Sequence, residues 1–392
     1  MVSFKKVMRA TLPVALCAGL LVGCGSNGAS EANANEIKVG INYELSGNTA
    51  SYGQSNVEGI TMAIDEVNAA GGVLGKTIVG VQGDNKSEAA EATAIATKLM
   101  TKDKVVAVLG PATSGNFKAQ SPIAEKNKIP TISASATADD VTVDSKGVKE
   151  YVFRLCFNDA YQGTAMAAFA TDNMKATKAV IIMDNSSDYA KGLAENFTTA
   201  FEANGGTIVD KAAYVAKDKD FNAILTKIKS ESFDVIFLPG YYEEAGLIIK
   251  QARALGITAP ILGGDGFDSP TLVQLAGADA LNDVYFSNHY TAIDQDPAVL
   301  KFIEDFKAKY GKEPNSFNAL GYDLGKFIAD AIERAGSEDP AEITKALAST
   351  TEFTGVTGTF SMDENHNPVK TITVIGLENG EQATSVKVEP KK

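Results

Sequence analysis

The stretch that decides the fold is Val105–Asn127, which reads V-V-A-V-L-G-P-A-T-S-G-N-F-K-A-Q-S-P-I-A-E-K-N. Its first five residues are apolar and mostly β-branched, which predicts a buried strand ending at a Gly-Pro turn. Small hydroxyl side chains follow at Thr113 and Ser114, and an amphipathic helix is predicted from about Asn116. The first turn of a helix carries N–H groups without intrahelical partners and a partial positive charge, so this junction favours an anion.

A second strand and loop of the same kind follow at Ile129–Thr137, I-P-T-I-S-A-S-A-T, and again end in hydroxyl side chains. Two neighbouring polar loops at strand ends are where an open α/β sheet holds a small ligand. The alternative interpretation is that Thr113 and Ser114 only cap the helix that they precede.

Strands and helices alternate from Glu36 onward, which predicts a mainly parallel sheet with helices on both faces. The alternation restarts after Val152–Leu155 and predicts a second sheet of the same kind. The tail differs, because it predicts three helices and then a strand pair formed by Val356–Phe360 and Thr371–Leu377. These elements are too few for a third core and are expected to complete the two earlier lobes.

The N-terminus carries Lys5, Lys6 and Arg9, followed by an apolar stretch, Ala10–Val22. This stretch is shorter than the ~20 residues that a membrane-spanning helix needs, and it ends in L-V-G-C. The ending resembles the bacterial lipobox, which implies cleavage before Cys24 and a lipid on its sulfur. An ordinary secretory signal with an incidental cysteine is the alternative. We therefore expect a signal peptide over 1–23 and a flexible tether over 24–35.

Composition excludes several classes of function. The chain has 392 residues, enough for two domains, and its formal net charge of −13 argues against binding nucleic acid. No G-x-S-x-G, H-E-x-x-H or cysteine cluster is present, so we expect neither an enzyme nor a metal site nor a cofactor. Ala70–Thr77 nearly spells a phosphate-binding loop, but a helix precedes it and a strand follows, which is the reverse of what such a loop requires. Cys156 is expected to be a buried small hydrophobe.

Several short motifs, taken in order, carry a resemblance that runs from Glu36 to near the end of the chain. They are I-K-V-G-I-N-Y-E-L-S-G at 37–47, D-E-V-N-A-A-G-G-V-L-G-K at 65–76, G-P-A-T-S-G at 110–115, I-S-A-S-A-T at 132–137, L-P-G-Y-Y-E-E-A-G at 238–246, Q-A-R-A-L-G at 251–256 and G-G-D-G at 263–266. In this order and spacing the chain resembles the leucine/isoleucine/valine (branched-chain amino acid) binding proteins of ABC importers.

The resemblance implies a type I periplasmic binding protein fold, in which two doubly wound parallel-sheet α/β lobes, joined by a hinge of three crossings, close on a ligand. The first lobe is then expected to comprise 36–156 and 290–353, and the second 157–289 and 354–392.

The resemblance also implies site residues. Ser114 matches the serine that binds the ligand α-carboxylate, and Thr137 the threonine that contacts carboxylate and ammonium. Ser135 lies where a backbone carbonyl accepts from the ammonium, and Asp265 where an acidic residue pairs with it. The aromatic wall positions are matched by Tyr52, Tyr189, Tyr241 and Phe317.

Some positions depart from the family pattern, and these departures affect which ligand side chain the site accepts. Tyr52 stands where some members have Trp, and Asp265 is one methylene shorter than Glu. Asp265 has a second interpretation as a plain turn residue between glycines. Of the adjacent pair Tyr241 and Tyr242, one is expected to line the cleft and the other to pack.

The function implied is that of a bacterial solute-binding protein on the outer face of the cell membrane, anchored only by lipid. It is expected to be a monomer that captures a branched-chain amino acid and delivers it to the permease subunits of an ABC importer. One alternative is the same role for another small amino acid or an amide. A second alternative is a ligand-sensing module of a signalling system.

Overall fold

The structure, a computed structural model, describes residues 35–388. The predicted signal peptide, the predicted lipid attachment at Cys24 and the tether up to residue 34 lie outside the described residues. Among the helices of residues 35–388, none has the length and apolar character needed to cross a membrane.

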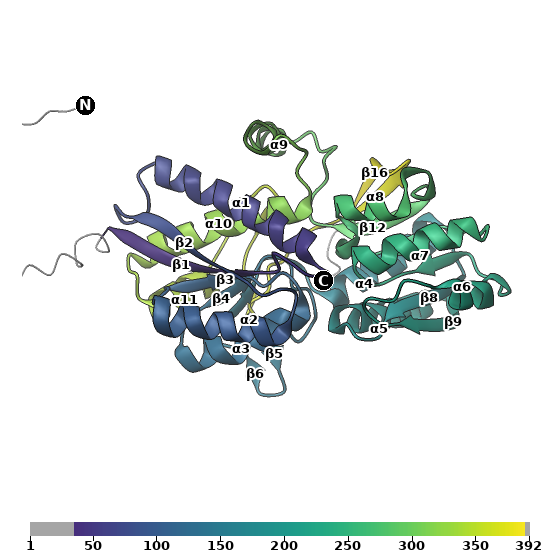
Figure 1. Ribbon diagram of the computed structural model, residues 1–392, viewed down its shortest axis with the longest axis horizontal. Coiled ribbons are helices and arrows are strands. Elements are labelled where there is room, and N and C mark those ends of the chain that lie inside the picture. The colour runs from purple at the N-terminus through teal and green to yellow at the C-terminus, as the bar shows by residue number, and fades with distance from the viewer. Residues whose placement is uncertain (1–34, 389–392) are drawn as a thin grey trace, which may run out of the picture. The chain divides into compact units, whose positions relative to one another are not determined.

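The first lobe is built on a five-stranded parallel sheet in the order β2-β1-β3-β4-β7 (Figure 1). Its strands are β1 (Glu36–Tyr43), β2 (Thr77–Asp84), β3 (Ala107–Leu109), β4 (Thr131–Ser133) and β7 (Val152–Arg154). The helices of this lobe are α1 (Ala50–Ala69), α2 (Ala89–Lys98), α3 (Ser114–Asn127), α9 (Pro297–Tyr310), α10 (Ser316–Ala335) and α11 (Pro340–Ala348). A small hairpin, β5 (Val143–Asp144) with β6 (Gly147–Val148), follows β4.

Both faces of this sheet are covered, as the strand alternation requires. Ile37, Val39 and Ile41 point to one face and pack with Ile60 of α1 and Leu320 of α10. The opposite face is covered by α2 and α3 in a separate apolar cluster formed by Leu99, Val105, Val108, Ala124 and their neighbours. In Figure 1 these two helix layers lie on either side of β1 to β4.

The second lobe is built on a seven-stranded sheet in the order β16-β15-β12-β11-β10-β8-β9. Its strands are β8 (Lys178–Asp184), β9 (Thr207–Tyr214), β10 (Val235–Phe237), β11 (Ile261–Gly263), β12 (Val284–Asn288), β15 (Ile372–Glu378) and β16 (Glu381–Val388). Five neighbouring strands of this sheet are parallel to one another, namely β12, β11, β10, β8 and β9. The other two, β15 and β16, are antiparallel to their neighbours. The helices are α4 (Asp159–Ala168), α5 (Asp188–Ala203), α6 (Asn222–Lys229), α7 (Tyr242–Ala254) and α8 (Pro270–Ala276).

Within residues 35–388 the chain passes between the two sheets three times, after β7, after β12 and before β15. The predicted fold class of two parallel-sheet lobes with a three-crossing hinge is therefore confirmed. Cys156 lies on the first passage and is fully buried, with no disulfide.

The predicted strand pair between 356–360 and 371–377 is wrong. The first segment belongs to a local hairpin, β13 (Phe353–Gly355) with β14 (Gly358–Phe360), and Phe353 and Phe360 pack on Phe327 of α10. The second segment, β15, pairs instead with β12 and β16. Alternating apolar residues identify a strand but not its partner, and here the partner is distant in sequence. The exact bounds of the two lobes stay a prediction.

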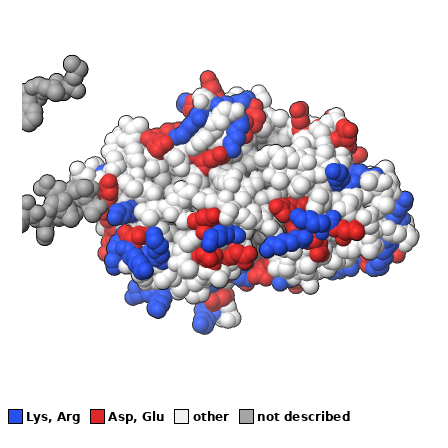
Figure 2. All heavy atoms as spheres, viewed as in Figure 1, with Lys and Arg blue, Asp and Glu red and all other residues white. Residues whose placement is uncertain are grey.

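The surface mixes charges of both signs. On the face shown in Figure 2, lysine and arginine side chains are interspersed with aspartate and glutamate side chains, and no patch of one sign covers it. The surface of this face therefore lacks the continuous basic stripe that phosphate backbones need.

Candidate ligand-binding site

The structure brings all eight predicted site residues into the lining of one pocket between the lobes. The first lobe contributes Tyr52, Ser114, Ser135, Thr137 and Phe317, and the second contributes Tyr189, Tyr241 and Asp265. All are buried except Tyr241, which is partly exposed. Chain segments more than a hundred residues apart thus converge on one enclosed space.

One end of the pocket is the start of α3. The helix begins at Ser114, two residues earlier than expected, and no side chain caps it, although Asn158 and Ser187 cap α4 and α5. The N–H groups of its first turn therefore lack an intrahelical or side-chain acceptor, which gives this end a partial positive charge. The Ser114 hydroxyl accepts from the N–H of Ala138 at 3.1 Å, so its own proton is free to be donated.

The second hydroxyl loop, after β4, packs directly against the first. Ser133 donates to the carbonyl oxygen of Pro111 at 2.7 Å, and Ser135 donates to that of Ala112 at 3.1 Å. Because these two serines hold the loops together, Thr137 is placed in the same pocket lining as Ser114.

A fully buried arginine that sequence reasoning missed supports this loop from behind. The guanidinium of Arg154 donates to the carbonyl oxygens of Ala136, Thr137 and Ala138 at 3.2, 2.8 and 2.9 Å. Burial lowers the pKa of Arg154. Its Nε donates to the amide oxygen of Asn367, and its Nη2 donates to the carbonyl oxygen of Asp139 at 3.4 Å. The signal that was available is a charged residue inside an apolar strand, V-F-R-L.

The opposite end of the pocket is the turn after β11. Asp265 is only 3% exposed, and one of its oxygens accepts from the Gln162 amide at 3.3 Å. The flanking glycines are needed for close approach. A Cβ on Gly264 would lie 2.3 Å from the Tyr189 hydroxyl, and one on Gly266 would lie 2.9 Å from the carbonyl oxygen of Gly240.

Gln162 joins two buried carboxylates. Its Nε2 donates to Asp159 at 2.7 Å and to Asp265 at 3.3 Å, and its Oε1 accepts from Ser287 at 2.8 Å. Burial raises the pKa of Asp159 well above its ordinary value. Sequence reasoning missed both Gln162 and Asp159, because a polar residue in a helical pattern gives no sign that tertiary packing buries it.

A buried histidine completes the surroundings of Asp265. His289 Nε2 lies 3.6 Å from an Asp265 oxygen, and the imidazole stacks on Phe157 with ring centres 3.6 Å apart. Burial lowers the pKa of His289 to about 4, although the nearby carboxylate favours the protonated ring. The imidazole is therefore neutral at pH 7, which leaves the negative charge of Asp265 available to a cation.

Aromatic rings form the walls between the two ends. Tyr52 stacks on Phe317 with ring centres 4.3 Å apart, and Tyr189 stacks on Tyr241 at 5.2 Å. Tyr52 also meets Tyr241 edge to face at 5.7 Å. Of the adjacent tyrosines, Tyr241 lines the pocket and Tyr242 packs on Tyr52 at 4.9 Å. These walls offer an apolar surface to a small aliphatic group.

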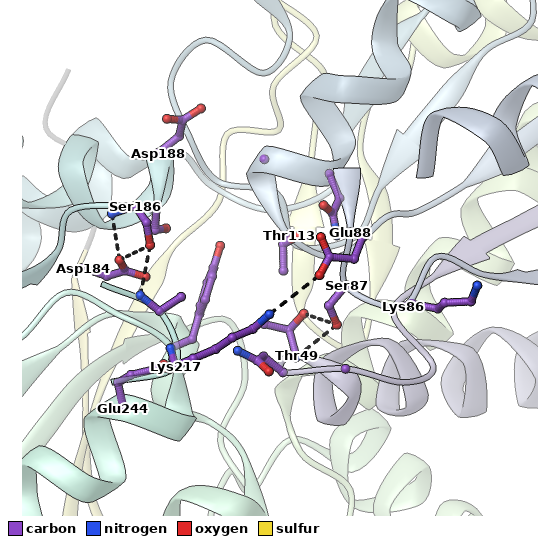
Figure 3. A pocket seen from close by; sticks show the side chains of 17 residues that line it. Thr49, Lys86, Ser87, Glu88, Thr113, Asp184, Ser186, Asp188, Lys217 and Glu244 are labelled. Atoms are coloured by element: carbon purple, nitrogen blue, oxygen red, sulfur yellow. Dashed lines mark hydrogen bonds and ion pairs between the residues drawn. The ribbon is translucent and has the colours of Figure 1, made fainter. Parts of the chain in front are cut away.

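A larger polar hollow adjoins the pocket and shares Thr113 and Tyr241 with it (Figure 3). Its side chains come from both lobes, with Thr49, Ser87 and Glu88 on one side and Asp184, Ser186 and Lys217 on the other. Lys217 Nζ lies 3.8 Å from Glu88, the ion pair drawn across the hollow in Figure 3. The hollow forms a polar entrance to the inner pocket.

A second ion pair joins the lobes beside this entrance. Lys118 of α3 lies 2.9 Å from Asp188 at the start of α5 and 2.6 Å from Asp140. Within residues 35–388, no group of three or more His, Cys, Asp or Glu side chains is arranged to hold a metal ion. The inner pocket has the uncapped start of α3 at one end, the buried carboxylate of Asp265 at the other and aromatic rings between them.

Known proteins share this architecture. The sequence profile of the periplasmic binding protein family matches residues 36–382. The Leucine-, isoleucine-, valine-, threonine-, and alanine-binding protein of Pseudomonas aeruginosa is 31% identical over 84% of this chain and 87% of that protein.

Two solved structures agree with that match. The branched-chain amino acid transporter substrate binding protein LivJ of Streptococcus pneumoniae, in complex with isoleucine, is 43% identical, with a TM-score of 0.86 over 91% of this chain and 100% of that one. The leucine binding protein LivK of Thermotoga maritima is 37% identical, with a TM-score of 0.85 over 90% and 99%. The chain belongs to the periplasmic binding protein family.

Proposed function

We propose that this protein captures a branched-chain amino acid (leucine, isoleucine or valine) outside the cytoplasm and delivers it to the permease of an ABC importer. The observation that carries the proposal is the pairing, in one buried pocket, of an uncapped helix start at Ser114 with a carboxylate at Asp265. An α-amino acid has one negative and one positive group on the same carbon, and such a zwitterion leaves water only if both charges find partners.

Each end of the pocket has a role in this proposal. Ser114 binds the α-carboxylate through its hydroxyl and backbone N–H, and Thr137 contacts both charged groups. The ammonium donates to the carbonyl oxygen of Ser135 and to the carboxylate of Asp265. Charge-assisted hydrogen bonds of this kind are about twice as strong as neutral ones.

In this proposal the aromatic walls determine which ligand side chain the pocket accepts. The rings of Tyr52, Tyr189, Tyr241 and Phe317 line the middle of the pocket, which favours a small aliphatic side chain of the ligand over a charged one. The isoleucine in the Streptococcus pneumoniae relative and the names of the Pseudomonas aeruginosa and Thermotoga maritima relatives support the same ligand class.

Capture requires the two lobes to open and close. In the proposed cycle the ligand first meets the Ser114 and Thr137 surface of the first lobe, and the second lobe then brings Asp265 and Tyr241. The ligand shifts the population toward the closed form because only that form contacts both of its charged ends. The closed form, as a monomer held to the membrane by lipid on Cys24, is the form that the permease receives.

Isothermal titration of the unfolded, ligand-stripped and refolded protein tests the proposal. Leucine, isoleucine and valine are expected to bind, whereas isopentylamine (no carboxylate) and 4-methyl-2-oxopentanoate (no ammonium) are expected to fail. Phenylalanine and alanine test the breadth of the aromatic wall, and leucinamide tests whether an amide can replace the carboxylate. Absence of heat with leucine, isoleucine and valine would overturn the proposal.

The lipid anchor is tested separately by cell fractionation. The wild-type protein is expected in the membrane fraction, and the Cys24→Ala variant in the soluble extracytoplasmic fraction. Equal partition of the two proteins would contradict lipidation at Cys24.

A further inference from the structure

Glu44 directly follows β1, and its carboxylate is enclosed by the loop that leads into α3. The residue is 0% exposed. One carboxylate oxygen accepts from the N–H of Ala112 at 2.9 Å. The other accepts from the N–H and the hydroxyl of Thr113 at 3.1 and 2.8 Å and from the Asn116 amide at 2.9 Å. These four donors supply the hydrogen bonds that the buried carboxylate would otherwise make to water.

The four donors stand on both sides of Ser114 in the sequence. Ala112 and Thr113 precede it, Asn116 lies two residues beyond, and Thr113 also lines the inner pocket. Because the N–H groups of Ala112 and Thr113 are occupied by Glu44, a ligand anion is left with the donors of the first helical turn, which begins at Ser114. Glu44 thus selects which donors of this junction face the ligand.

The backbone of Glu44 also supports the aromatic wall. Gly53 of α1 packs so closely on it that a Cβ there would lie 2.0 Å from the Glu44 carbonyl oxygen. Tyr52, which lines the pocket, precedes Gly53 on the same helix. One residue therefore contacts both the helix that carries Tyr52 and the segment around Ser114 at the start of α3.

We propose that Glu44 is a positioning residue for the carboxylate end of the pocket: it holds the 112–116 segment, the end of the loop and the first residues of α3, so that Ser114 and the first turn of α3 receive the ligand anion. The inference rests on the proposed function, because it takes a free amino acid as the ligand. Glutamine at this position keeps the shape but places an NH₂ donor against at least one of the four donors, so the loop must shift.

A double-mutant cycle tests this role in leucine binding. Glu44→Gln is expected to weaken leucine binding by about tenfold, and so is Ser114→Ala, because each disturbs a hydrogen bond to a charged group. If Glu44 acts through the Ser114 junction, the double variant loses at least about fivefold less than the product of the two single losses, since coupled residues are non-additive. If Glu44→Gln instead weakens binding only by lowering the stability of the whole protein, the double variant loses affinity by the product of the two single losses.

Glu125→Gln is the matched control. Glu125 lies on α3 and accepts from the N–H of Tyr151 at 2.7 Å, so it too is a carboxylate that holds backbone in the first lobe. It does not line the pocket. This variant is expected to bind leucine as the wild type does and to combine with Ser114→Ala in a strictly multiplicative way.

The outcomes separate the two proposals. If the wild type binds none of leucine, isoleucine and valine, the proposed function fails, and the inference about Glu44 fails with it. If the wild type binds and the Glu44→Gln cycle is multiplicative, only the inference about Glu44 is overturned. If Glu44→Gln does not fold, Asn116→Ala replaces it in the cycle, because it removes one of the four donors and leaves the buried carboxylate three. Multiplicative losses in that cycle overturn the inference as well.

Discussion

The Tyr52 hydroxyl donates a hydrogen bond of 2.5 Å to the carbonyl oxygen of Gly266, which belongs to the other lobe. The same hydroxyl accepts from the N–H of Tyr242 at 3.2 Å, so one phenol of the first lobe bonds two backbone groups of the second. Both bonds join the two lobes, so separation of the lobes would break them. Tyr52 therefore lines the pocket and also links the two lobes through these hydrogen bonds.

Tyr52→Phe removes the hydroxyl that forms these hydrogen bonds and keeps the ring that stacks on Phe317. A net hydrogen bond contributes about 1 kcal/mol, so we expect ligand affinity to fall by roughly fivefold. The loss should appear in the dissociation rate, measured by stopped-flow fluorescence, because closure follows the first encounter. A slower association with unchanged dissociation contradicts the assignment.

Ser114→Ala is expected to weaken leucine binding by about tenfold or more, since a hydrogen bond to a charged group contributes about 1.5–3 kcal/mol. Titration calorimetry measures the loss. Ser121→Ala is the matched control, because Ser121 lies on the same helix, is buried, and donates to the carbonyl oxygen of Phe117. Equal losses in the two variants would refute a direct contact by Ser114.

The lowered pKa of His289 should appear in the pH dependence of the stability of the protein. Burial lowers its pKa to about 4 in the folded protein, whereas in the unfolded chain it titrates near 6.5. Between these values the unfolded chain binds more protons, so His289 reduces stability as pH falls from about 6.5 to about 4, by at most ~1.4 kcal/mol per pH unit. Thermal unfolding of His289→Gln at pH 7, 6 and 5 should show a smaller drop than the wild type. Identical drops contradict the assignment of a neutral buried imidazole.

Lys118→Ala tests the ion pair that joins α3 to Asp188. Both side chains are partly exposed, so the pair is expected to contribute less than about 1 kcal/mol to closure, and salt should screen it. Ligand affinity of the wild type should fall by a few-fold between low and high salt, and that of the variant should change less. Lys301→Ala removes the Asp305 pair within α9 and is expected to leave affinity unchanged. If the two variants respond alike to salt, the pair plays no part in closure.

Much of the fold was predictable because local signals agreed with the tertiary structure. The apolar run at Val105–Leu109, the turn that follows and the hydroxyl loops each have a local cause. The structure has a strand in this run, although only over Ala107–Leu109, and both hydroxyl loops line the pocket. The partner of β15 was not predictable, because the residues that make a strand do not say which strand lies beside it.

The supporting residues of the site were the hardest to predict. Glu44 and Gln162 look in sequence like solvated polar residues, and only Arg154 carries a signal, yet all three are 0% exposed. Each is buried because segments distant in sequence supply hydrogen-bond partners, among them Ala112 for Glu44, Thr137 for Arg154 and Ser287 for Gln162. A single sequence records the polar residue but not the loop that will enclose it, so the lining of the pocket was predictable and its support was not.

Cys156, on the first passage between the lobes, has a consequence for the chemical durability of the molecule. Disulfide exchange and oxidation require an accessible thiolate, and burial raises the pKa of this thiol to about 12. Oxidants and other thiols therefore do not reach the Cys156 sulfur while this passage keeps its folded structure. A thiol reagent would label Cys156 only when the passage itself unfolds. Labelling of this sulfur therefore distinguishes unfolding of the hinge from opening of the lobes.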